Sequence, residues 1–113
     1  MKSPKRILAL AVLSAACAAS LQARADQCRL PPAPSKIPDG SRATQQEMIT
    51  AMETIKQYNS DVQTYLKCLD FEGRQNQLSP GDQASLHNAA LSQLTHVADQ
   101  FNAQVRSFKS KHG

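Results

Sequence analysis

The feature that most constrains the fold is a run of apolar residues spaced alternately four and three apart between residues 48 and 69. An α-helix turns once in about 3.6 residues, so this spacing predicts one long amphipathic helix. Thr44 and Glu47 match a capping box at its start. We expect the helix to cover about residues 44–72 and to end between Glu72 and Gln77, with Gly73 as the candidate terminator. The stripe contains Met48, Met52, Ile55, Val62, Leu66 and Leu69.

Asn59 occupies the one polar position in this stripe. It is interpreted either as a partly hydrated position or as a polar contact that fixes the helix register. Both interpretations stay open on the sequence alone.

A second helix is predicted at about residues 80–110. Ser79 is suited to cap its first turn, and Pro80 is suited to the first helical position. Its apolar stripe reads Ala90, Leu94, Val97, Phe101 and Phe108, flanked by Ala84, Leu91, Ala98 and Val105. No segment alternates with a period of two, so we expect no strands. The sequence therefore predicts an all-α fold, an antiparallel two-helix hairpin that resembles a coiled coil.

The segment 26–43 precedes the hairpin and contains Pro31, Pro32, Pro34 and Pro38, so we expect an extended, proline-rich arm. Cys28 lies at its start, and Cys68 lies about 36 Å along the first helix. A disulfide between them requires the arm to double back along that helix. Tyr58 and Tyr65 share a flank with Cys68, so we expect the arm to cover their rings through Pro31, Pro34 and Ile37.

Residues 1–25 have the order of a cleaved secretory signal: a basic start, a short apolar run, and the small residues Ala23 and Ala25. Cleavage is expected between Ala25 and Asp26, with release into the periplasm or the medium. The apolar run is about 13 residues, too short for a stable membrane span. A lipoprotein anchored through Cys17 is the alternative. In an oxidising compartment, the remaining Cys28 and Cys68 are expected to form one disulfide.

The charge balance argues against nucleic acid as a partner. The chain carries a net charge of +4, and residues 1–25 contain four basic residues and no acidic one. From Asp26 onward, basic and acidic residues are equal in number, so the exported part has no basic excess to attract phosphates.

Three segments resemble a set of small exported proteins of Proteobacteria that have no established function. They are Cys28-Arg29-Leu30-Pro31, Ile37-Pro38-Asp39-Gly40 and Tyr65-Leu66-x-Cys68-Leu69. The resemblance covers about residues 28 to 69. It implies a periplasmic setting and a bridge between Cys28 and Cys68, and it carries no catalytic residues.

The sequence offers little chemistry. Ser92, His96 and Asp99 share one helix face and mimic a catalytic triad, but they are expected on the polar side, where nothing would exclude water. Two ligands, His96 and Asp99, are too few for a zinc site. We therefore expect no enzyme, no cofactor and no metal. The sequence favours a protein-interaction or structural module with an unknown protein partner, which could be a second copy of itself; the alternative is a periplasmic chaperone-like or stress-response protein.

Overall fold

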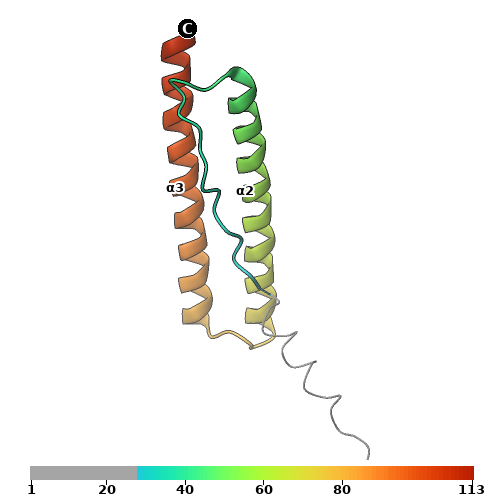
Figure 1. Cartoon of the computed structure of the whole chain (residues 1–113). Coiled ribbons are helices and arrows are strands. Elements are labelled where there is room, and N and C mark those ends of the chain that lie inside the picture. The colour runs from blue at the N-terminus through green and yellow to red at the C-terminus, as the bar shows by residue number, and fades with distance from the viewer. Residues whose placement is uncertain (1–27) are drawn as a thin grey trace, which may run out of the picture.

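The computed structural model describes residues 28–113. It contains an extended arm and two helices, α2 (Gln45–Arg74) and α3 (Pro80–His112), which run antiparallel and pack side by side (Figure 1). Residues 28–113 contain no strand. The predicted fold class is confirmed: an all-α hairpin with a proline-rich arm joined to the first helix by a disulfide. The predicted signal segment and its cleavage site between Ala25 and Asp26 lie outside the described residues.

Both helices begin where their capping residues predict. Thr44 Oγ1 accepts a hydrogen bond from the Glu47 amide at 3.1 Å, and the Thr44 amide donates to Glu47 Oε2 at 2.7 Å, which completes the capping box. Ser79 Oγ accepts from the Asp82 amide at 3.1 Å, and Pro80 occupies the first helical position. These bonds satisfy amide groups that have no partner inside the helix.

Helix α2 ends at Arg74, within the predicted range, but Gly73 is not its terminator. Asn76 takes the left-handed conformation instead, with φ 58°. Its amide donates to the Gly73 carbonyl at 3.1 Å, and the Gln77 amide donates to the Glu72 carbonyl at 2.8 Å. These two bonds are those of a Schellman motif with asparagine where glycine is more usual.

Gly73 lies against the Gln83 side chain on α3. A Cβ atom there would overlap the side-chain oxygen of Gln83, which would have to move. The same Gln83 donates through Nε2 to Asp70 Oδ1 at 2.9 Å, and this exposed contact joins the two helices next to the turn.

The core lies along the seam, which we define as the buried line where α2 and α3 meet. Val62 and Ala90 are fully buried, and Leu69 and Val97 are 1% and 2% exposed. Ile55 and Leu94 pack against this cluster and are half-buried. No polar or charged residue of the described chain is buried, so apolar burial dominates the seam, and the Gln83–Asp70 hydrogen bond adds an exposed contact near the turn. Neither described helix is apolar enough over a sufficient length to cross a membrane.

The arm, residues 28–43, crosses one face of the hairpin diagonally, from the turn end of α2 toward the C-terminal part of α3 (Figure 1). From the sequence, the arm was expected to lie over α2 alone. The contact with α3 depends on Gly40, which is buried and donates its amide to Gln104 Oε1 at 2.8 Å. A Cβ atom at this position would overlap the backbone carbonyl of Gln104, so only glycine fits here.

A turn after Gly40 returns the chain to the start of α2. The Asp39 carbonyl accepts from the amides of Arg42 at 3.0 Å and Ala43 at 2.8 Å. Asp39 Oδ1 accepts from the Ser41 hydroxyl at 2.7 Å and the Ser41 amide at 3.0 Å. These bonds lower the pKa of Asp39 below 3.8, because they favour its charged form.

Candidate interaction surface

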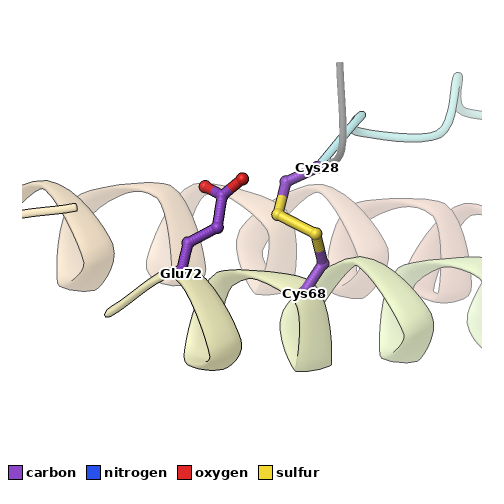
Figure 2. Close-up of side chains that lie close together, drawn as sticks. All are labelled: Cys28, Cys68 and Glu72. Carbon is purple, nitrogen blue, oxygen red and sulfur yellow. A yellow bond between two sulfur atoms is a disulfide. The ribbon is translucent and has the colours of Figure 1, made fainter. Parts of the chain in front are cut away.

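The disulfide joins Cys28 of the arm to Cys68 of α2, with a Cα–Cα distance of 5.5 Å. Figure 2 shows the Glu72 carboxylate beside the two sulfur atoms, one helical turn beyond Cys68. The sulfur atoms and a carboxylate oxygen lie within 4.8 Å of one another, a ligand spacing compatible with a metal ion. Both sulfurs are bonded to each other, however, and thiolate is the form of cysteine that binds metals. The arrangement therefore acts as a covalent link.

The residues expected to pack under the arm lie together. Tyr58 and Tyr65 are 4% and 7% exposed, and Ile37 packs against the cluster that contains both rings. Pro31 and Pro34 are half-buried; both border the hollow next to Tyr58, and Pro31 also borders one next to Tyr65. The arm thus forms a third layer over the tyrosine flank of the hairpin.

Tyr58 differs from the other residues of this layer because its hydroxyl is buried without a hydrogen-bond partner. Burial disfavours the charged phenolate and so raises the pKa of Tyr58 above 10.0. The sequence predicted that the arm covers the Tyr58 ring. It could not predict the unpaired hydroxyl, because hydrogen bonding of that group depends on which arm atoms lie next to it.

A shallow groove of about 520 Å³ runs between the arm and the first half of α2. Part of its polar lining is engaged within the chain: Thr54 Oγ1 donates to the Thr50 carbonyl at 3.1 Å, and Glu47 Oε2 accepts from the Thr44 amide at 2.7 Å. Binding pockets for small molecules present convergent polar groups in a mostly enclosed space. This open groove has neither property.

Ser92, His96 and Asp99 are all exposed, as sequence analysis expected. In the described chain no hydrogen bond or ion pair joins them to each other. A hydroxyl becomes a nucleophile when an adjacent base accepts its proton in a site that excludes water. The arrangement of these three side chains supports neither condition.

The remaining surface of interest is the face of the hairpin opposite the arm, which we call the arm-free face. It consists of Met52, Ile55 and Asn59 on α2, and of Leu91, Leu94, Ala98, Phe101 and Val105 on α3. On each helix these positions follow from the helical repeat. Met52 is six residues from Tyr58, and Ala98 is six residues from Gln104, which places each about 120° round its helix from the arm side.

The arm-free face is apolar and open to solvent. Met52 is 37% exposed and Leu91 is 36% exposed, and the adjacent Ile49 is 36% exposed. Ile55, Leu94 and Phe101 are half-buried at its centre. Asn59 is exposed among them, so it is not part of a buried layer within one chain.

Sequence analysis assigned Met52 to the seam and treated Leu91, Ala98 and Val105 as flanks of one stripe. The sequence does hold a signal for a second stripe: Leu91, Leu94, Ala98, Phe101 and Val105 are spaced alternately three and four apart. Such spacing gives a continuous apolar face on a helix. It runs parallel to the seam and is not covered by the arm.

Comparison with known proteins finds no matching family model, no matching curated protein and no matching solved structure. The function must therefore be inferred from the surfaces of this chain.

Proposed function

We propose that this protein is a non-enzymatic interaction or structural module that binds another protein through its arm-free face. The observation that carries the proposal is the continuous apolar surface that remains after the arm has covered the opposite side. Apolar side chains that gather on one exposed face of a folded chain often mark a binding surface. The two apolar stripes of α3 support this proposal: one packs against α2 within the hairpin, and the other is available to bind a partner.

The absence of a catalytic role is part of this proposal. Its support is chemical: the triad-like residues are exposed and separate, and the sulfur atoms near Glu72 are bonded to each other. Two polar groups that line the arm groove, the Thr54 hydroxyl and the Glu47 carboxylate, are engaged with their own chain.

We further propose that the protein acts in the periplasm or outside the cell. The signal-like pattern of residues 1–25 supports export. The Cys28–Cys68 bridge adds modest support, since disulfides persist mainly in oxidising compartments.

Site-specific photo-crosslinking in intact cells tests the interaction. A photoreactive residue at Leu91 should form a defined adduct with one protein species. The same residue at Ser92, its exposed neighbour about 100° round the helix, is the matched control and should form little or none. Equal labelling at both positions, or no adduct at Leu91, would contradict the proposed surface.

The chaperone-like alternative gives a different result in the same system. A holding chaperone would yield many adducts of unrelated mass at Leu91, and the purified protein would suppress aggregation of an unfolded client at stoichiometric ratio. A single adduct without such suppression supports the module.

A further inference from the structure

The arm-free face has a symmetry that identifies its partner. On α3, Leu94 and Ala98 lie two residues either side of His96, and Leu91 and Phe101 lie five residues either side. His87, half-buried, and Val105 lie nine residues either side. When two such helices pack in reversed orientation, Leu94 meets Ala98 and Leu91 meets Phe101. Val105 meets the half-buried His87.

Helix α2 has its own centre at the same height. Asn59 is the fifteenth of the thirty residues of Gln45–Arg74. From the Asp70–Gln83 contact, Asn59 lies eleven residues back along α2 and His96 thirteen residues forward along α3. These offsets correspond to about 17 Å and about 20 Å, so the two centres are nearly level across the hairpin.

We propose that the partner is a second copy of this chain. The arm-free faces of the two copies pack against each other with their helix ends reversed, about a two-fold axis near Asn59 and His96. This inference rests on the proposed interaction function and names its partner. The assembly is a four-helix bundle with the two arms on its outer faces. An interface of this kind is isologous, so the same patch serves both copies.

The two-fold axis gives Asn59 a role. It is an exposed polar residue between Ile55 and the exposed Gln63 on this side of α2, and the axis brings it next to Asn59 of the second copy. Two carboxamides related by two-fold symmetry can each donate to and accept from the other. A polar pair in an apolar interface fixes the register, since any slipped pairing would leave the amides unpaired.

Charge supports the reversed orientation. On this side of the hairpin the exposed Asp70 lies near the turn end, whereas the exposed Lys109 lies near the C-terminal end of α3. Reversal brings Lys109 of one copy opposite Gln83 of the other, next to Asp70. It also places the α3 helix dipoles antiparallel. Alignment of like ends would instead bring the two basic ends together.

Sedimentation equilibrium of the bridged protein in the form that the cell exports tests the proposal. The wild type should dimerise at micromolar concentration. Asn59→Asp places two carboxylates on the axis and should weaken dimerisation at least about tenfold, because charges buried without a partner are strongly disfavoured. Ser60→Asp adds the same charge to an exposed neighbouring position and should leave the dissociation constant unchanged. Circular dichroism checks that both variants keep their helices.

A distance measurement tests the orientation. With a spin label at Lys111→Cys, pulsed electron resonance should give about 45 Å between the two labels, since each lies fifteen residues from the axis. A value near two helix diameters, about 20 Å, would mean that like ends align and would overturn the proposal. A monomer up to millimolar concentration, or a dimer that Asn59→Asp does not affect, would also overturn it. If the protein is monomeric but Leu91 crosslinks to a different protein in cells, the dimer is wrong and the interaction function stands.

Discussion

At the scale of single residues, two positions give the most specific predictions: Tyr58, which lies beneath the arm, and Gly40, which is part of it. Tyr58 has its ring in the core and its hydroxyl buried without a partner. Gly40 allows the arm to approach the backbone of α3. Neither property is visible in the sequence, because each depends on a segment that lies far away along the chain.

The hydroxyl of Tyr58 should reduce stability. A buried donor without a partner loses its hydrogen bonds to water and gains none in return, so Tyr58→Phe should raise the free energy of unfolding by about 1 kcal/mol. Thermal or chemical unfolding checks this value. A variant less stable than the wild type would mean that the hydroxyl has a partner in the folded protein.

Burial also predicts a pH dependence. The pKa of Tyr58 lies above 10.0 in the folded chain, because the charged form is disfavoured by burial. Above pH 10 the unfolded chain therefore loses this proton while the folded chain retains it, and stability should fall as the pH rises. In a Tyr65→Phe variant Tyr58 is the sole tyrosine, so ultraviolet absorbance of phenolate follows it directly. A midpoint at or below pH 10 would contradict the buried position.

Gly40→Ala should destabilise the fold by about 1–3 kcal/mol, because the added methyl overlaps the Gln104 carbonyl and forces the arm away from α3. Gly81→Ala is the matched control. Its added Cβ has no neighbour within 4 Å, and alanine favours a helix over glycine, so stability should stay equal or rise. Chemical unfolding compares the two. Equal losses in both would argue against the arm contact.

At the scale of elements, the hairpin and the arm differ in what holds them. The helices start at local capping patterns and meet along an apolar seam, so they can form without the arm. The arm has no regular backbone hydrogen bonds of its own in the described chain. Its position depends on the bridge at one end, on Gly40 at the other, and on the apolar contacts of Ala33 and Ile37 between them.

Cys68→Ser should therefore lower the melting temperature strongly while most of the helical circular dichroism persists. The bridge spans 40 residues of sequence. On the chain-entropy account, closing such a loop contributes about 4 kcal/mol, or about 15 °C or more in melting temperature for a domain of this size. A thiol reductant should produce the same shift in the wild type and none in Cys68→Ser. An unchanged melting curve would contradict the stapled layer.

The same distinction explains what sequence could predict at this scale. Thr44 with Glu47 and Ser79 with Pro80 are local patterns, so both helix starts were predictable. The end of α2 was predictable as a range, Glu72 to Gln77, but its terminating residue was not, because Gly73 and Asn76 both tolerate helix-ending geometry. Asn76 takes the left-handed conformation, and Gly73 lies against the Gln83 side chain of α3, a contact that exists only in the folded hairpin.

At the scale of the whole molecule, the arm makes the two faces of a thin hairpin unequal. One face gains a third layer over Tyr58 and Tyr65, and the other keeps Met52 and Leu91 exposed. The sequence predicted that Ala90 and Val97 face the seam, and both are buried. The flank that Cys68 shares with Tyr58 and Tyr65 also predicted the side of α2 that the arm covers, whereas the path of the arm onto α3 was not predictable, because it depends on the distant contact between Gly40 and Gln104.

Hydroxyl-radical footprinting of the bridged protein, at a concentration that keeps it monomeric, tests the two unequal faces most directly. Met48 and Met52 are a matched pair one helical turn apart, 7% and 37% exposed. Met52 should react several times faster than Met48, and Tyr58 should react far more slowly than in the unfolded chain. Equal rates at the two methionines would show that Met48 is not buried in the folded chain, and a Tyr58 rate that matches the unfolded chain would show that the arm does not cover this side of the hairpin.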